Sequence, residues 1–144
     1  MNIELDPIGF VRTDSQKVPR HWSVSDLEGD LAIDERYARG LKDITVGQRI
    51  VVIFLFHRSP KFHPDLLTQW PPHQDRAMGV FSICSPYRPN PIGMSVLEVL
   101  DIEGGTLHVK GLDMIDGTPI LDIKPYVVDK ATCPSYERKG NPEG

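Results

Sequence analysis

The sequence contains few cysteines and no long apolar run. Only Cys84 and Cys133 occur among its 144 residues, and their separation matches no metal-binding spacing. This usage argues against a disulfide framework and is typical of a reducing compartment. The longest apolar run, residues 50–56, is far too short to span a membrane, and residues 1–6 do not resemble a signal peptide. We therefore expect a cytoplasmic protein with no membrane partner.

The sequence also lacks the marks of a Rossmann fold. It has no G-x-G-x-x-G motif and no alternation of strands with helices. Many short apolar segments indicate a mainly β sandwich or barrel in one domain. The one good helix candidate is 34–41, which Asp34 can cap. The expected strands are 3–11, 29–33, 49–56, 79–84, 95–103, 106–111 and 120–128, and Gly104-Gly105 turns the chain between the fifth and the sixth.

Residues 58–76 form a long segment with four prolines and no periodicity. A loop of this length is uncommon in a compact domain unless it has a function. The continuous apolar run of 49–56, in contrast, predicts a strand buried on both faces or one at a barrel closure.

Proline gives the stretch Ser85-Pro86-Tyr87-Arg88-Pro89-Asn90-Pro91-Ile92-Gly93 a restricted backbone. Each proline fixes its own φ and pushes the preceding residue toward an extended conformation. The result is a stiff polar loop between two apolar runs, a usual place for binding and catalytic groups. Arg88 and Asn90 are its candidate functional side chains, although a plain connector would have the same composition.

A second dense segment runs from Gly111 to Tyr126 and contains three aspartates within ten residues. Asp116-Gly117 is a turn signal, and Asp116 in such a turn commonly binds its own backbone. Asp122 and Lys124 are expected to pair on one face of the following strand. The aspartates fit no calcium loop and have no His or Cys at ligand spacing, so we expect no metal.

The net charge of −4 argues against binding nucleic acid through bulk electrostatics. A local basic patch would still allow it. The candidates for such a patch are Arg12, Lys17, Arg20, Arg36, Arg39, Lys42, Arg58 and Lys61.

Together these segments resemble the TrmO family, also called TsaA-like or YaeB-like. The matching pieces occur in family order over about residues 6–128, and the most specific are Arg88–Gly93 and Asp113–Tyr126. The others are Pro7–Arg12, Gly40–Ile44, Phe54–His57 and Met78–Phe81.

The resemblance implies an S-adenosylmethionine-dependent tRNA methyltransferase acting on the N6 of threonylcarbamoyladenosine beside the anticodon. It also implies a compact β-barrel over residues 1–130, with one or two short helices and long loops, followed by a polar tail over 131–144. The expected partners are the tRNA anticodon loop and a second copy of the chain, with the cofactor near the subunit interface.

The resemblance further implies cofactor contacts at four places. They are Pro19, Arg20 and His21; His57 and Arg58; Asn90, Ile92, Gly93 and Met94; and Ile115, Asp116, Gly117 and Thr118. Cys84 belongs with them, because several relatives have arginine at this position. Cysteine in place of that arginine removes a guanidinium that could hold a carboxylate or phosphate. We predict Arg88, Asp116 and Lys124 as the catalytic residues, Arg88 first because its loop restrains it.

Two other functions remain open. One is a nucleotide- or RNA-binding barrel without catalysis, which the acidic charge and Cys84 would allow. The other is a metal-dependent hydrolase using His57, Asp113 and Asp116. Trp22 and Trp70 could stack on a base, although a tryptophan is more often a packing residue.

Overall fold

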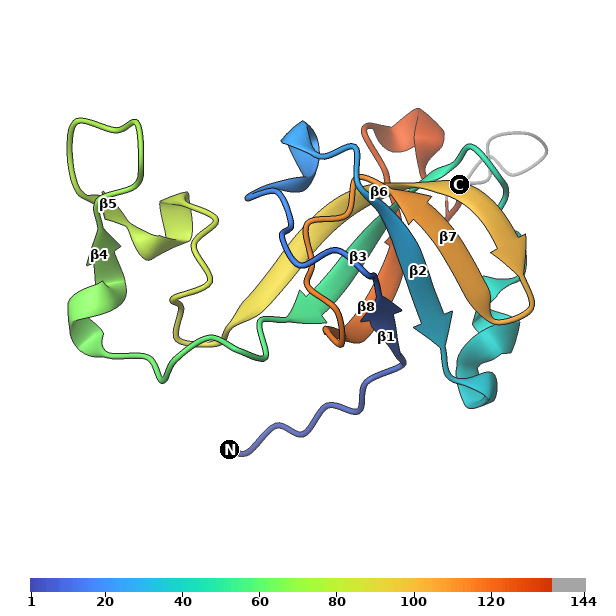
Figure 1. Ribbon diagram of the computed structural model, residues 1–144, viewed down its shortest axis with the longest axis horizontal. Helices are drawn as coiled ribbons and strands as arrows, with labels where there is room; N and C mark the ends of the chain where they lie inside the picture. The colour runs from blue at the N-terminus through green and yellow to red at the C-terminus, as the bar shows by residue number, and fades with distance from the viewer. Residues whose placement is uncertain (136–144) are drawn as a thin grey trace.

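The computed structural model describes residues 1–135, and six of its strands close into an antiparallel barrel. The strands follow the order β1-β2-β7-β6-β3-β8, and pairing of Gly9 with Ile120 joins β8 back to β1 (Figure 1). Their bounds are β1 (Gly9–Arg12), β2 (Glu28–Ile33), β3 (Arg49–Leu55), β6 (Ile92–Glu103), β7 (Thr106–Lys110) and β8 (Pro119–Pro125). The expected mainly β barrel is confirmed. Part of the expected tail, residues 136–144, lies outside the described residues.

Alternating side chains build the barrel core. In β3, Ile50, Val52 and Phe54 point inward and are buried, whereas Val51 and Ile53 are only half-buried. The apolar run of 49–56 is therefore covered on one face only, unlike the expected strand buried on both. The fully buried members of the core include Val11, Leu31, Val52, Leu97, Val99, Leu107, Val109, Leu112 and Ile120.

The helices are all short 3-10 turns. The expected helix appears as η2 (Glu35–Leu41), and the Asp34 side chain caps it by accepting a hydrogen bond from the Arg36 amide at 2.9 Å. The others in the described part of the chain are η1 (Trp22–Val24), η3 (Pro64–Leu67), η4 (Val80–Ser82) and η5 (Lys130–Thr132). None of these helices, within residues 1–135, has the length and apolar character needed to cross a membrane.

Several strand limits differ from those expected. The strand predicted over 3–11 begins only at Gly9, where Ala32 and Ile33 become available as partners, and the strand predicted over 120–128 ends at Pro125. The strand predicted over 79–84 is wrong, because pairing stops at Gly79 and the chain turns into η4. In contrast, the tight turn between β6 and β7 is confirmed, with Gly104 at φ 60°.

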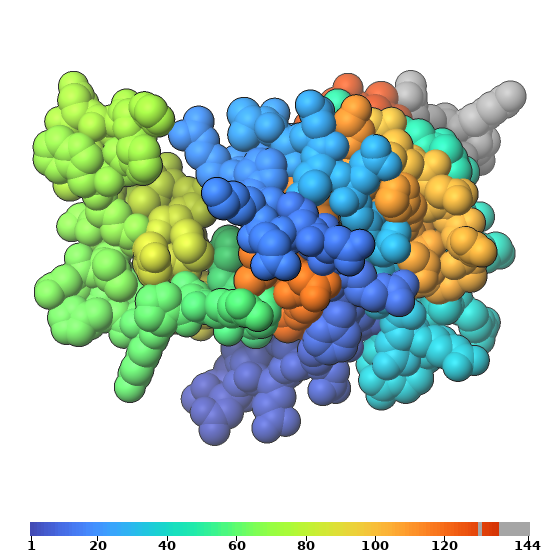
Figure 2. Space-filling view, viewed as in Figure 1, coloured from blue at the N-terminus to red at the C-terminus, as the bar shows by residue number. Residues whose placement is uncertain are grey.

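Residues 57–91, which we call the arm, leave the barrel between β3 and β6. The arm includes η3, η4 and a small hairpin of β4 (Thr68–Gln69) and β5 (Met78–Gly79). It forms the left end of the molecule in Figures 1 and 2. The Gln69 side-chain amide braces the arm by donating to the carbonyls of Leu66 and Tyr87, at 2.7 and 2.8 Å. The long loop predicted over 58–76 is therefore an ordered projection.

Candidate functional site

A pocket of about 230 Å³, which we call the barrel-end pocket, opens where β3 leaves the barrel. Three segments far apart in the sequence form it: the end of β3 with the start of the arm, the proline-framed loop, and the turn before β8. Its lining residues are Phe54, Leu55, Phe56, His57, Arg58, Ser59, Pro60, Pro86, Tyr87, Asp113, Met114, Ile115 and Thr118. Both motifs singled out in the sequence therefore contribute to one pocket.

The turn before β8 owes its shape to Gly117 and Thr118. Gly117 has φ 81°, a conformation that side-chain-bearing residues rarely adopt. The buried hydroxyl of Thr118 donates to the Ile115 carbonyl at 2.7 Å and closes the turn. The carboxylate of Asp116 accepts a hydrogen bond from the Thr13 amide at 3.0 Å, so it ties the turn to the N-terminal segment. The expected bond from Asp116 to its own backbone is replaced by this longer-range one.

Gly93 gives the pocket its aromatic wall. A β-carbon there would collide with the rings of Phe54 and Phe56. These rings pack edge to face, with centroids 4.9 Å apart and planes at 76°. Gly93 therefore acts through packing, because its missing side chain lets both rings approach β6.

Asp113 is the pocket's partly buried acid. Its Oδ1 atom accepts a hydrogen bond of 2.5 Å from the fully buried hydroxyl of Ser95. Burial raises the pKa of the Asp113 carboxyl, and the Ser95 hydrogen bond, the charge of nearby His21 and the Trp22 backbone oppose that rise. Asp113 thus connects the barrel interior at Ser95 with the segment around His21. A carboxyl with a raised pKa in a pocket is a common feature of functional sites.

The segment at His21 is held mainly by its own contacts. The Nδ1 atom of His21 accepts from the Ser23 amide at 3.2 Å, and its ring lies 5.0 Å from that of Trp22. Of the three residues predicted here, only His21 interacts with Asp113, and its charge acts to lower the pKa of the Asp113 carboxyl. Pro19 is half-buried and Arg20 exposed, and neither lines the barrel-end pocket.

Arg88 holds its own loop in shape. Its Nη1 atom donates to the carbonyls of Ile83 and Ser85, at 2.9 and 3.1 Å. Its neighbours Pro86 and Tyr87 line the pocket, whereas Arg88 does not. This contact fixes the loop that carries the pocket wall, a positioning role that the sequence alone did not reveal. Asn90 is exposed, and its carbonyl accepts from the Ile92 amide at 2.7 Å.

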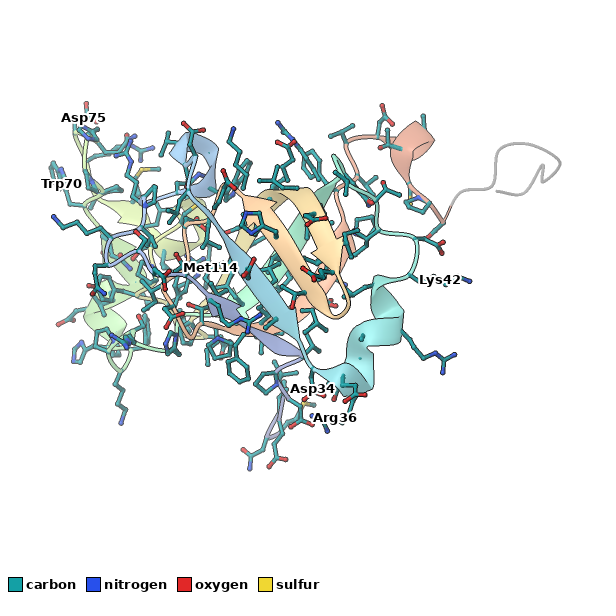
Figure 3. The ribbon with its side chains drawn as sticks, turned by 45° about the vertical axis from the view of Figure 1, so that its right-hand side comes forward. Asp34, Arg36, Lys42, Trp70, Asp75 and Met114 are labelled. Atoms are coloured by element: carbon teal, nitrogen blue, oxygen red, sulfur yellow. The ribbon has the colours of Figure 1, made fainter. Side chains whose placement is uncertain are left out.

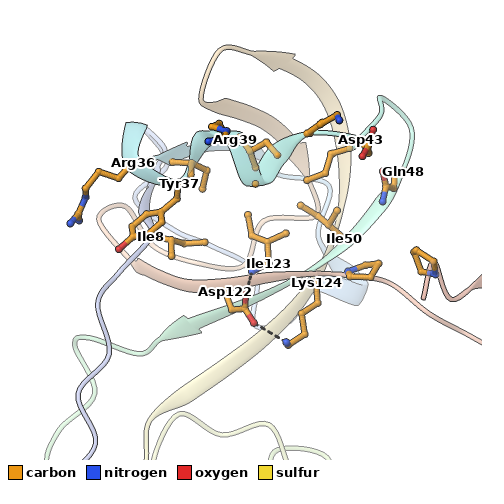
Figure 4. Close-up of a pocket in the computed structure, with 17 residues that line it drawn as sticks. Ile8, Arg36, Tyr37, Arg39, Asp43, Gln48, Ile50, Asp122, Ile123 and Lys124 are labelled. Atoms are coloured by element: carbon orange, nitrogen blue, oxygen red, sulfur yellow. Dashed lines mark hydrogen bonds and ion pairs between the residues drawn. The ribbon is translucent and has the colours of Figure 1, made fainter. Parts of the chain in front are cut away.

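The structure separates Lys124 from the rest of the predicted catalytic group. Lys124 is exposed near the far end of β8 and pairs with Asp122 at 2.9 Å, as expected from the sequence (Figure 4). It lies six positions along the chain from Thr118, or roughly 20 Å at the usual rise of a strand. It lines another cavity, of about 850 Å³, between η2 and the barrel. Arg88, Asp116 and Lys124 therefore do not meet at one pocket.

Most of the predicted cofactor residues do not line the pocket, and among them are Ile92, Met94 and Cys84. Ile92 and Met94 point outward from β6, and their side chains are 40% and 53% exposed. Cys84 is exposed on the arm. His57, Arg58, Ile115 and Thr118 do line the pocket, and a β-carbon at Gly117 would lie 4.0 Å from the His57 Nε2 atom.

Sequence reasoning gave too little weight to Asp113 and Tyr87. Tyr87 sits between two prolines and beside Arg88, so its place in the stiff loop was the available signal. In the sequence, Asp113 has a role only in the alternative metal-dependent hydrolase. In the described part of the chain, no three His, Cys, Asp or Glu side chains are grouped as a metal site requires.

Fold and site together define a closed, six-stranded antiparallel barrel with a pocket at one end and a projecting arm beside it. The sequence model of the tRNA-methyltransferase O N-terminal domain matches residues 11–130. The chain belongs to the TrmO family.

Known relatives agree with this assignment. A probable S-adenosyl-L-methionine-binding protein of Archaeoglobus fulgidus is 40% identical over 88% of this chain and 34% of its own length. The human tRNA (adenine(37)-N6)-methyltransferase is 32% identical over 89% of this chain and 31% of its own. A crystal structure of TrmO from Pseudomonas aeruginosa superposes with a TM-score of 0.70 at 31% identity, covering 97% of this chain and 61% of that one. The chain thus spans between 31% and 61% of the length of these relatives.

Proposed function

We propose that this chain is an S-adenosylmethionine-dependent methyltransferase that acts on the N6 of threonylcarbamoyladenosine beside the anticodon of a tRNA. The observation that carries the proposal is the meeting of His57, Tyr87 and Thr118, from three separate motifs, at one pocket. The names of the Archaeoglobus and human relatives support the cofactor and the class of acceptor. The family resemblance in the sequence motifs supports the particular nucleoside.

The residues of the pocket suit a nucleoside that carries a positive centre. The rings of Phe56 and Tyr87 offer flat apolar surfaces whose faces attract cations. Asp113 and Thr118 supply polar groups beside them. When bound, the cofactor supplies an electrophilic methyl group on a positively charged sulfur. The fixed walls of the pocket orient the two reactants and keep water away, which are the main requirements of methyl transfer.

A proton must leave the acceptor nitrogen when the methyl group arrives. His57 and Asp113 bring to the pocket the groups that could take this proton, an imidazole nitrogen and a carboxylate oxygen. The pKa of Asp113 is raised by burial, which makes its carboxylate a stronger base than an exposed one. Arg88 positions the loop from outside the pocket through Ile83 and Ser85.

A homodimer completes this proposal. The barrel-end pocket is smaller than the roughly 300–1,000 Å³ that small-molecule sites usually occupy. Cys84, Ile92 and Met94 match family positions for the cofactor, yet they lie outside this pocket. A second copy that packs against the exposed face of β6 would let these residues complete the partner's site. Light scattering should show a dimer, and Met94→Glu should weaken both dimerisation and cofactor binding. A monomer that binds the cofactor normally would contradict this part.

Calorimetry with purified protein tests the proposal against its alternatives. S-adenosylmethionine should bind, and a concentration of 100 times its dissociation constant should add about 2.7 kcal/mol to the free energy of unfolding. A protein stabilised by a divalent metal and not by the cofactor would favour the hydrolase. Cofactor binding without methylation of tRNA would favour the non-catalytic barrel.

A further inference from the structure

The arm is positively charged within an acidic chain. Residues 57–91 contain four Lys or Arg and two Asp or Glu, a net charge of +2, whereas the whole chain has −4. The basic residues are Arg58, Lys61, Arg76 and Arg88, and the acidic ones are Asp65 and Asp75. Arg58, Lys61 and Arg76 are exposed, and no ion pair joins any of them to another described residue. The arm therefore carries exposed positive charge and a net positive charge, in a chain whose overall charge is negative.

The outer end of the arm presents one aromatic ring in a fixed position. Trp70 follows β4 directly, and its indole N–H donates to the Gln74 carbonyl at 2.8 Å. The Gln74 amide in turn bonds the Pro71 carbonyl at 3.3 Å, and His73 turns the chain with φ 69°. The edge of the indole is thus anchored in its own loop. Its side chain is 66% exposed, at the end of the molecule away from Met114 (Figure 3).

A second exposed aromatic side chain belongs to the same arm. Phe81, in η4, is 80% exposed, while its neighbour Val80 is buried and anchors the turn. Exposed apolar rings that share one projecting segment are candidates for a contact surface. The polar edge of Trp70 is already satisfied by Gln74, which leaves the ring face as its recognition surface.

We infer that the arm binds the unpaired bases of an RNA loop, with Trp70 stacking on a base and Arg58, Lys61 and Arg76 contacting phosphates. This inference rests on the proposed function, which makes a tRNA anticodon loop the substrate. Proteins recognise RNA loops by stacking splayed bases on aromatic side chains, because those bases are free of the helical stack. Lysine and arginine side chains on the same arm would neutralise the backbone phosphates. The anchored indole loses little conformational freedom on binding.

Substitutions at Trp70 test the inference through binding alone. The probe is a synthetic RNA stem-loop with an anticodon-loop sequence, and the comparison RNA is the same stem closed as a plain duplex. Trp70→Leu should raise the dissociation constant for the stem-loop by about 5- to 150-fold, the usual range for one lost stack. Trp70→Phe, which keeps a ring, should retain most of the affinity. Neither should change duplex binding, and Phe10→Leu, at an exposed ring on the barrel, should change neither.

Charge neutralisation provides a second readout. Replacing Arg58, Lys61 and Arg76 by glutamine should flatten the salt dependence of stem-loop binding by about 0.7 in log–log slope for each lost phosphate contact. Wild-type stem-loop affinity in Trp70→Leu would overturn the inference. Equal losses of stem-loop affinity in Trp70→Leu and Trp70→Phe would also overturn it. So would a lower molecular mass of Trp70→Leu than of the wild type in light scattering, because the ring would then contact a second copy of the chain.

The outcome is separable from that of the proposed function. Cofactor affinity of Trp70→Leu, measured by calorimetry, should equal that of the wild type, since Trp70 does not line the barrel-end pocket. If methyl transfer fails in the wild type while stem-loop binding still depends on Trp70, the RNA-binding role of the arm stands without the catalytic one. If methyl transfer succeeds and Trp70→Leu binds the stem-loop normally, only the role of the arm fails.

Discussion

The hydroxyl of Ser95 and the carboxylate of Asp113 form a 2.5 Å hydrogen bond between the barrel interior and the candidate pocket. Ser95 is completely buried on β6, and Asp113 is half-buried before the turn to β8. The bond favours the charged form of Asp113, while burial disfavours it. This pair therefore couples the packing of the barrel to the ionisation of an acid at the pocket.

Removing the Ser95 hydroxyl should destabilise the fold in a pH-dependent way. Ser95→Ala should lower the free energy of unfolding near neutral pH by about 1–3 kcal/mol, the cost of leaving a buried charged acceptor without its donor. The loss should shrink as the pH falls toward the carboxyl range of about 4 and Asp113 becomes neutral. Urea unfolding at several pH values measures it. Ser82→Ala, at an exposed serine, is the control. An equal loss at every pH would show that Asp113 is already neutral.

A histidine on the barrel wall should stabilise the protein more in acid than in alkali. His108 lies 2.7 Å from Asp30 and 2.8 Å from Glu28, which raise its pKa, and Asp101 is opposite it on β6. Because the folded pKa exceeds the unfolded value of about 6.5, the stabilisation is complete below that value. It is lost as the pH rises through the folded pKa.

Thermal unfolding of the wild type and His108→Gln tests this. The wild type should melt higher than the variant at about pH 5.5, and the gap should narrow by about pH 8.5, beyond the ordinary histidine range of about 6.5. The site is partly exposed, so added salt should reduce the gap. A constant gap across the pH range would show that the charge of His108 does not contribute.

Gly117 should be sensitive to the smallest substitution. Gly117→Ala places a β-carbon at φ 81°, which costs roughly 1–2 kcal/mol for an L residue. Cofactor binding should weaken as well, because the new carbon would lie near His57 at the pocket rim. Gly40→Ala is the matched control: its β-carbon meets nothing within 4 Å, and stability should be kept or raised. Wild-type stability and binding in Gly117→Ala would mean that the turn relaxes freely.

Arg88 should matter for rate more than for folding. Its guanidinium bridges two loop carbonyls, a planar arrangement that lysine does not reproduce. We expect Arg88→Lys to lower methyl transfer at least tenfold, about 1.4 kcal/mol of transition-state stabilisation. The melting temperature should hardly change, and hydrogen exchange over residues 83–90 should become faster. A positioning role is excluded if the rate falls without faster exchange, or if the rate stays at the wild-type value.

Periodicity and turn chemistry explain why much of the fold was predictable. Gly104-Gly105 predicts the turn of the β6–β7 hairpin, and the apolar run of residues 49–56 predicts strand β3. The false strand over 79–84 shows the limit. Val80 and Phe81 are both apolar and adjacent in the sequence. Val80 is nevertheless buried and Phe81 is 80% exposed, because no partner strand continues beyond Gly79.

The site was predictable in its segments more than in its side chains. The Asp113–Tyr126 motif reads as one unit in sequence, but β8 carries Lys124 away from Thr118 toward another cavity. Likewise, the alternation of β6 turns Met94 outward while its neighbour Gly93 faces the aromatic wall. The direction of a side chain depends on strand register, which a motif does not state.

Single-turnover transfer of a labelled methyl group tests the central claim most directly. The protein, with S-adenosylmethionine, should label a tRNA that carries threonylcarbamoyladenosine beside its anticodon. Digestion to nucleosides should place the label on N6 of that residue, and the same tRNA without the modification should stay unlabelled. Absence of label in the modified tRNA, despite tight cofactor binding, would contradict the proposed function, and label on the unmodified tRNA would contradict the proposed nucleoside.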